Sequence, residues 1–249
     1  MESLVPNIQS SCFRRSTVVF VPTAKFAYSA AMLLADCVLF IDAEAMILDK
    51  PAGLAVDAPR DGSLSVMNHL DSLRFGFERH PSIVHRLDRD TSGCLLLARN
   101  PKAQKRFSQA FEAGTVEKTY LAVLAGVPTA PGGKIDMPLN KVSTREAGWR
   151  MIHEPKGQRA VTHWDVVTFG DGKALVRFRP ETGRTHQLRV HAASGIGIAI
   201  EGDPVYGMKG PHMLLHAESL SVPREGKAAV MATAPLPLHF PDWARHAIG

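Results

Sequence analysis

Residues 85–93 of the chain read HRLDRDTSG, the most unusual nine residues of the sequence. Seven of these side chains are polar and five are ionisable. The apolar pair at 83–84 precedes them, and the apolar run CLLLA follows them at 94–98. A polar loop between two buried strands suits an active site, because the scaffold fixes the geometry of its side chains. The alternative is a solvated turn whose Asp and Arg side chains pair at the surface.

The sequence on both sides of this loop predicts short strands, turns and few helices. Strands are expected at 37–41, 46–48, 94–98, 117–126, 161–169, 174–179, 214–215, 219–222 and 229–233. Helices are expected at 63–73, 102–113 and 185–193, the first from apolar residues at three-residue steps. Strand and helix do not alternate regularly, which favours an α+β fold with a mainly antiparallel, mixed β-sheet flanked by helices.

Composition excludes several classes of protein. An apolar content of 45% and a charged content of 21% over 249 residues exclude a disordered or collagen-like chain. No window approaches the roughly 18–20 apolar residues of a membrane-spanning helix. The net charge of +5 allows a nucleic-acid partner without establishing one. The three cysteines have unrelated spacings and form no disulfide framework, which predicts a cytoplasmic protein.

The chain is expected to hold one catalytic domain, residues 37–249, after a poorly ordered N-terminal extension, residues 1–36. Arg14 and Arg15 precede an apolar stretch, so a targeting segment is an alternative, although Pro22 and Lys25 interrupt it. Met32 is an alternative start. Loops are expected across 127–160, where Pro and Gly are frequent near the beginning.

The stretch 85–93 resembles the signature of the RluA-type pseudouridine synthases, His-Arg-Leu-Asp-x-x-Thr-Ser-Gly, at every fixed position. Further segments resemble motifs of that family in the same order: KPAGL at 50–54, KTYLAVLAG at 118–126, TGRTHQLRVH at 182–191, GDPVYG at 202–207 and LHA at 215–217. The resemblance covers residues 37–240. It implies the pseudouridine synthase fold, an active-site cleft across the sheet, and an isomerase that converts uridines of RNA to pseudouridine.

The resemblance also assigns catalytic roles. Asp88 is the ionised carboxylate, acting either as nucleophile or as general base. Arg184 is the guanidinium expected to pair with it, since a nearby cation favours the charged form of a carboxylic acid. Tyr120 is expected to stack on the target uracil. The isomerisation involves no redox change and no energy input, so no cofactor is expected.

RNA contacts are expected from basic and polar side chains around these residues. Arg86 is the candidate to fill the position of a uridine flipped out of its stack. The other candidates for substrate or RNA contact are His85, Thr91, Lys102, Lys105, Arg106, Lys118 and Arg189. A second basic group lies at 141–159. The expected partner is a stem-loop of ribosomal or transfer RNA, with no membrane and no obligate protein partner, and the protein is expected to be a monomer.

Three other interpretations of the sequence are a metal site, an RNA-binding module without activity, and a glycosidase. His186 and His191 are five residues apart, whereas zinc helices prefer a spacing of four, so no metal is expected. An RNA-binding module of the same fold without activity is the alternative function. A glycosidase is the third, because Asp88 and Asp90 could supply the two carboxylates that its chemistry needs.

Overall fold

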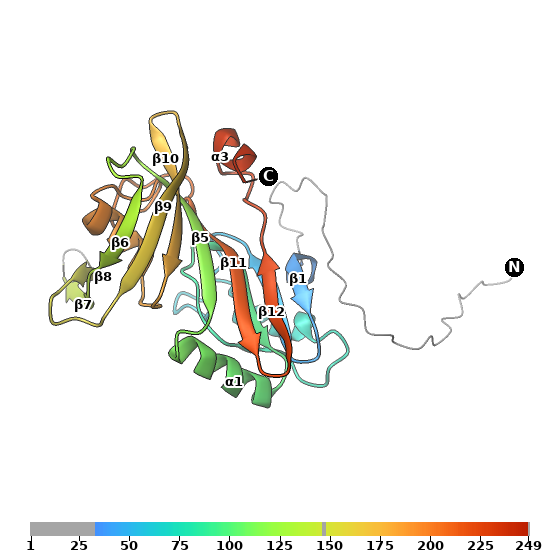
Figure 1. Ribbon diagram of the computed structural model, residues 1–249. Coiled ribbons are helices and arrows are strands. Elements are labelled where there is room, and N and C mark those ends of the chain that lie inside the picture. Colours follow the sequence, from blue (N-terminus) through green and yellow to red (C-terminus); the bar gives the residue numbers. More distant parts are fainter. Residues whose placement is uncertain (1–32, 146–147, 249) are drawn as a thin grey trace, which may run out of the picture.

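The apolar run after the HRLDRDTSG loop forms a fully buried central strand, β4 (Ser92–Ala98). β4 pairs antiparallel with β2 (Ala45–Lys50) and parallel with β11 (Leu215–Arg224). The computed structural model describes residues 33–145 and 148–248. In this part of the chain β4 belongs to a ten-stranded sheet of order β1-β2-β4-β11-β5-β10-β9-β6, with β12 on β11 and β3 on β4 (Figure 1). Only the β4–β11 ladder is parallel among the described ladders, which confirms the α+β class with a mainly antiparallel sheet.

The remaining elements are short. The other strands are β1 (Val38–Ile41), β3 (Ser82–Ile83), β5 (Glu117–Leu124), β6 (Gly132–Asp136), β7 (Leu139–Thr144), β8 (Gly148–His153), β9 (Val161–Gly170), β10 (Lys173–Pro180) and β12 (Lys227–Thr233). The helical elements are η1 (Leu34–Cys37), η2 (Val66–Leu73), α1 (Pro101–Glu112), α2 (Gln187–Val190), η3 (His191–Ile196) and α3 (Asp242–His246). In Figure 1, α1 lies at the lower end of β5 and β11, and α3 lies at the opposite end.

Alternation of side chains along β4 separates two parts of the core. Leu95 packs with η2 and with Leu87, the residue before Asp88. Leu96 packs with Phe107 of α1 in the other cluster. Because successive side chains of a strand point to opposite faces, Leu87 is anchored on the face of β4 opposite α1.

Strand β5 divides its side chains in the same way. Leu121 packs with Ala244 of α3, whereas Ala122 packs with Leu188 of α2. Tyr120 has the parity of Ala122 and contacts both the cluster that holds Leu87 and the cluster that holds Leu188. The register of β5 therefore places the Tyr120 ring between the HRLDRDTSG loop and α2.

The structure corrects several predicted elements. The segment expected as loops at 127–160 contains β6 and the two-stranded β7–β8 sheet. The helix expected at 185–193 is a short α-helix, α2, continued by the π-helical η3 through Ile196. The helix expected at 63–73 begins only at Val66, after the Ser65 cap, so Leu64 precedes it and is exposed. Packing against neighbouring elements, which local periodicity does not record, sets these ends.

The described chain begins to pack before the predicted domain boundary. Leu34 is buried with Cys37 in the cluster that contains Leu87, so residues 34–36 belong to the folded part of the chain. The predictions for residues 1–32 lie outside the described residues.

An ion-pair network around Glu44 joins the turn between β1 and β2 to α1 and β12. Its carboxylate accepts hydrogen bonds from Lys227 at 3.0 Å and from Arg106 at 2.8 Å. These hydrogen bonds, with Lys227 the larger contributor, lower the pKa of Glu44 to about 2. A carboxylate whose folded-state pKa is lowered stabilises the fold above its unfolded pKa, near 4.5, and this contribution disappears as the pH falls through about 2.

We expect Glu44→Gln to lower the free energy of unfolding at pH 7 by about 1–2 kcal/mol, a value reduced for the partial solvent exposure of the network. Urea unfolding of both proteins at pH 7 and near pH 2 tests this, because the difference should shrink at the lower pH. Glu112→Gln, at the exposed end of α1, is the matched control. A Glu44→Gln deficit that is the same at both pH values would contradict the assignment.

Candidate active site

The loop that carries Asp88 is braced by the turn after β2. Lys50 is fully buried, and its Nζ donates to the carbonyl oxygens of Pro51, Leu54 and Arg89 at 2.8, 2.8 and 3.0 Å. The backbone N–H of Gly53 also donates to the Arg89 carbonyl at 2.9 Å. The KPAGL segment thus holds the backbone directly after Asp88.

The other end of the loop depends on a close approach of two backbones. Gly93 lies beside Ala217 of β11, and a Cβ atom at this position would lie 2.2 Å from the Ala217 carbonyl oxygen. Its φ of +103° also favours glycine. Next to it, Ser92 Oγ and His216 Nδ1 are 2.9 Å apart and both residues are buried. The Ser-Gly end of one motif therefore fits directly against the LHA motif.

Arg189 connects Asp88 to a second carboxylate. Its Nη1 donates to Asp88 Oδ2 at 3.1 Å, while Nε and Nη2 donate to the two oxygens of Asp203 at 2.7 and 2.8 Å. Arg189 and Asp203 are buried, whereas the Asp88 side chain retains 24% of its exposure. The Arg189 guanidinium thus binds Asp203 through two N–H groups and binds the solvent-accessible Asp88 through a third.

The pKa shifts of this cluster follow from burial and charge. Burial alone would raise the pKa of Asp203, but the hydrogen bonds and charge of Arg189 outweigh it and lower that pKa. Burial opposes the charge of Arg189 as well, and the two carboxylates nevertheless raise its pKa above the ordinary value. Arg189 is therefore a permanent cation beside Asp88.

His186 lies on the other side of Asp88, with its Nε2 3.8 Å from Asp88 Oδ2. Burial lowers the pKa of His186 despite the nearby Asp88 charge, so the ring is neutral at pH 7. Its Nδ1 lies 2.9 Å from the hydroxyl of Tyr206. His186 has a left-handed backbone with φ +52°, a conformation that costs about 1–3 kcal/mol for most residues and often occurs at functional sites.

Tyr120 is a further side chain near Asp88. It is partly buried between the two clusters described above. Burial raises the pKa of its hydroxyl above the ordinary value, and the negative charge of Asp88 raises it further. The hydroxyl is therefore protonated at neutral pH and lies within the electrostatic range of Asp88.

The predicted ion pair between Arg184 and Asp88 is wrong. Arg184 is exposed, and its Nε donates to the Arg159 carbonyl at 3.1 Å. The guanidinium beside Asp88 belongs to Arg189, five residues further along the same motif. The reason is helical geometry: Arg189 lies within α2 and points inward, whereas Arg184 lies before it, in the turn that Gln187 Oε1 stabilises.

The structure also places the residues proposed for RNA contact. Arg86 is exposed and pairs with Asp57 at 2.9 Å. His85 and Thr91 are internal: the His85 Nε2 accepts the Leu96 N–H at 2.9 Å, and Thr91 is 2% exposed. The His85 side chain therefore connects the loop to β4, and the Thr91 side chain is closed to solvent.

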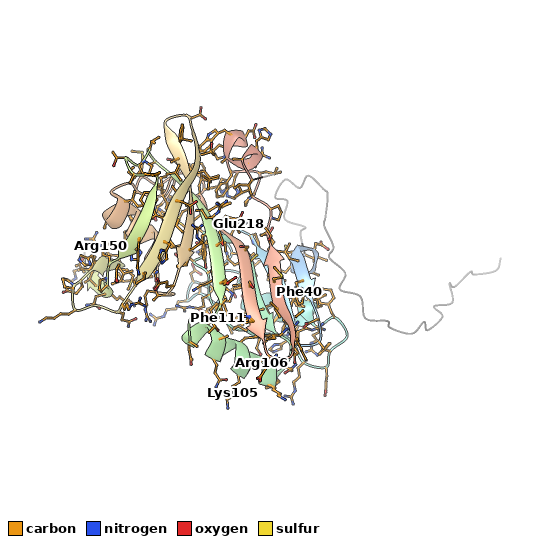
Figure 2. The ribbon with its side chains drawn as sticks, in the orientation of Figure 1. Phe40, Lys105, Arg106, Phe111, Arg150 and Glu218 are labelled. Atoms are coloured by element: carbon orange, nitrogen blue, oxygen red, sulfur yellow. The ribbon has the colours of Figure 1, made fainter. Side chains whose placement is uncertain are left out.

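The other basic side chains predicted to contact RNA differ in their exposure and in their partners. Lys118 is partly buried, 3.4 Å from the Thr182 carbonyl, and burial lowers its pKa. Lys102 and Lys105 are exposed on α1, but Arg106 is bound to Glu44. Figure 2 shows Lys105 and Arg106 on α1 and Arg150 of the β7–β8 sheet in a different part of the molecule. The two basic groups thus form separate surfaces.

Sequence reasoning missed the roles of Lys50, His186 and Asp203. Each lies in a segment quoted for its resemblance, and the available signal was a charged or polar residue adjoining an apolar strand or helix. Spacing alone did not indicate which residues meet, because β2, β4 and α2 are far apart in the chain.

The fold and site define an enzyme class with a mainly antiparallel sheet, an accessible carboxylate in contact with a buried arginine, and a protonated tyrosine within electrostatic range of that carboxylate. The family model described as RNA pseudouridylate synthase matches residues 44–194. The chain belongs to this family of RNA-modifying isomerases.

Individual relatives agree with the family. An RNA pseudouridine synthase of Zymomonas mobilis, described as uncharacterized, is 60% identical over 214 residues, covering 84% of this chain and 98% of that protein. The ribosomal large subunit pseudouridine synthase D of the same organism is 33% identical, covering 83% and 67%. The solved human RNA pseudouridylate synthase domain containing 1 has a TM-score of 0.69 at 26% identity, covering 84% of this chain and 86% of that one.

The helices of residues 33–145 and 148–248 include none long and apolar enough to span a membrane. Two cysteines of this part of the chain, Cys37 and Cys94, are buried free thiols, and burial raises the pKa of Cys37 to about 11 and that of Cys94 to about 12. Both are therefore uncharged side chains of the core.

Proposed function

We propose that this pseudouridine synthase isomerises specific uridines in structured ribosomal or transfer RNA, with Asp88 as the catalytic carboxylate. The observation that carries the proposal is the contact between the accessible Asp88 and the buried Arg189, beside Tyr120. The similarity to a ribosomal large subunit pseudouridine synthase supports an RNA of this type.

The reaction breaks the bond between uracil N1 and ribose C1′ and rejoins the base through C5. Asp88 acts at the ribose–base junction as nucleophile or as general base. Arg189 holds the Asp88 carboxylate in one orientation through the hydrogen bond from Nη1, and the charge of Arg189 is balanced by Asp203. Tyr120 stacks on the uracil, which contributes about 1–3 kcal/mol.

The target uridine has to leave its stack before Asp88 can reach it, at a cost of a few kcal/mol. Arg86 is the residue that we propose fills its position. Its side chain is 65% exposed and is held by a surface ion pair with Asp57, which is also half exposed. A surface pair of this kind contributes little, so the guanidinium can exchange Asp57 for RNA at small cost.

Three of the predicted RNA contacts remain proposed contacts through charge alone: Lys102, Lys105 and Lys118. For Arg184, which was predicted as a catalytic residue, we propose a contact with RNA of the same kind. The cytoplasmic location rests on the cysteine usage of the sequence. The monomeric state likewise remains a prediction.

Mapping of pseudouridine in total RNA from cells with and without the gene tests the proposal. We expect one or a few sites in ribosomal or transfer RNA to disappear without the gene and to return with the wild-type copy. A copy carrying Asp88→Asn should not restore them. If every site in every class of RNA persists without the gene, the proposed function is contradicted.

A further inference from the structure

The β7–β8 sheet carries an aromatic side chain that the reaction does not use. Its register pairs Lys141 with Met151 and Ser143 with Trp149, so Lys141, Trp149 and Met151 share one face. Met151 is buried with Val190 of α2, and its N–H donates to the Tyr206 hydroxyl at 2.9 Å. The face that carries Trp149 is therefore the face directed toward α2.

A single residue, His186, lies between Trp149 and Asp88. Its ring centroid is 4.8 Å from that of His186, with an interplanar angle of 33°. The same His186 places Nε2 3.8 Å from Asp88 Oδ2. Yet the Trp149 residue is 47% exposed, unlike Met151 beside it on the strand. A large aromatic surface is thus open to solvent, separated from Asp88 by the His186 ring.

The surroundings of this ring are positively charged. The Lys141 ammonium lies 5.0 Å from the Trp149 ring centroid, a cation–π contact made by an exposed and flexible side chain. Arg145, directly after β7, is exposed as well, and Arg150 is exposed on the opposite face of the same hairpin, because it follows Trp149 in β8. None of these three cations forms an ion pair within residues 33–145 and 148–248.

We propose that Trp149 is a stacking platform for the nucleobase of a nucleotide adjoining the target uridine, and that Lys141 moves from the indole ring to the phosphate of that nucleotide. The inference rests on the proposed function, because it takes RNA as the ligand. An exposed indole with a mobile cation offers the two groups that single-stranded nucleic acid needs, a π-face for the base and a charge for the phosphate.

Trp149 would contact a nucleotide next to the reacting uridine, and this contact would form only if the RNA chain follows a particular path. Trp149 is held by His186, whose own backbone is fixed next to α2. The indole is therefore positioned relative to Asp88, and a base stacked on it fixes which nucleotide reaches the carboxylate. Specificity for a particular uridine then depends on the nucleotides that flank it.

Binding by protein that carries Asp88→Asn tests the platform without requiring catalysis. The probe is total RNA from cells lacking the gene, and inorganic polyphosphate serves as an anion without bases. The chain has three tryptophans, so fluorescence of the parent is compared with that of the same protein carrying Trp149→Phe. RNA should quench a component of the emission that Trp149→Phe lacks. Polyphosphate can draw Lys141 from the ring but has no base to stack on it, so it should not quench that component.

Affinity provides the second measurement. Loss of a base stack predicts that Trp149→Ala weakens RNA binding by about 5- to 150-fold at constant salt, and that Trp149→Phe restores most of it. Phe169→Ala is the matched control, because Phe169 is also an exposed aromatic side chain, but in β9 at the turn to β10. This control should bind RNA like the parent.

Three results would overturn the platform: equal quenching in the parent and Trp149→Phe, equal quenching by polyphosphate, or unchanged affinity in Trp149→Ala. If Trp149 only supports His186, the catalytically active protein with Trp149→Ala should lose kcat and keep its KM, whereas loss of a stack raises KM. If the wild-type protein forms no pseudouridine, the proposed function fails, and the binding measurements still decide the platform.

Discussion

Asp88→Asn is expected to abolish pseudouridine formation while the protein folds and binds RNA. Removal of one positioned acid–base group costs about 10²–10⁴-fold in rate, and removal of a nucleophile stops turnover altogether. The measurement is pseudouridine formation in RNA extracted from cells that lack the gene, followed over time with purified protein.

The geometry explains why the fold should tolerate this change. Asp88 and Asp203 share the single cation Arg189, so the neutral amide introduced by Asp88→Asn leaves a balanced Arg189–Asp203 pair. The side-chain oxygen of asparagine can still accept the hydrogen bond from Arg189 Nη1. Thermal unfolding of the variant should therefore resemble that of the wild-type protein.

Asp90→Ala is the matched control for Asp88→Asn. Asp90 lies two residues away in the same loop, and the glycosidase interpretation gives it an essential role. We expect this variant to stay active. Full activity in Asp88→Asn, or loss of activity in a folded Asp90→Ala protein, would contradict the assignment of the catalytic carboxylate.

Arg189→Met is expected to destabilise the protein strongly as well as to inactivate it. Removal of one partner of a buried ion pair leaves an uncompensated charge and typically costs about 3–5 kcal/mol. Here the orphaned group is Asp203, whose side chain has no exposure, and Asp88 loses its ion pair with a guanidinium. For a protein of this size the expected fall in Tm is roughly 6–20 °C.

A second substitution separates stability from catalysis. Arg189→Met combined with Asp203→Leu removes both buried charges, so we expect it to recover much of the lost stability. It should remain inactive, because Asp88 still lacks its guanidinium. Thermal unfolding and pseudouridine formation are measured on both proteins.

Arg184→Gln distinguishes the two arginines of the TGRTHQLRVH segment. Arg184 is exposed and donates to a backbone carbonyl, so its loss should change Tm by no more than about 2 °C. If Arg184→Gln inactivates the enzyme while Arg189→Met does not, the arginine that supports Asp88 has been assigned wrongly.

Much of the fold was predictable from local pattern. The buried run at 94–98 lies within β4, and the hairpin expected at 161–179 is present as β9 and β10 with Asp171 and Gly172 in the turn. Such elements are coded by neighbouring residues, through apolar runs and turn residues. The β7–β8 sheet was missed because most of its side chains are exposed and it has little apolar alternation.

The sequence by itself determined the family, the α+β class and the loop that carries Asp88, because these depend on residue types in a fixed order. Only the tertiary structure decided that Arg189 contacts Asp88 and that Asp203 binds the same guanidinium. Only it showed that the His186 ring lies between Trp149 and Asp88. The physical reason is that these contacts join β4, α2 and β8 across distant parts of the chain. Whether a side chain points inward or outward there depends on helix phase and strand register, both of which are set by packing.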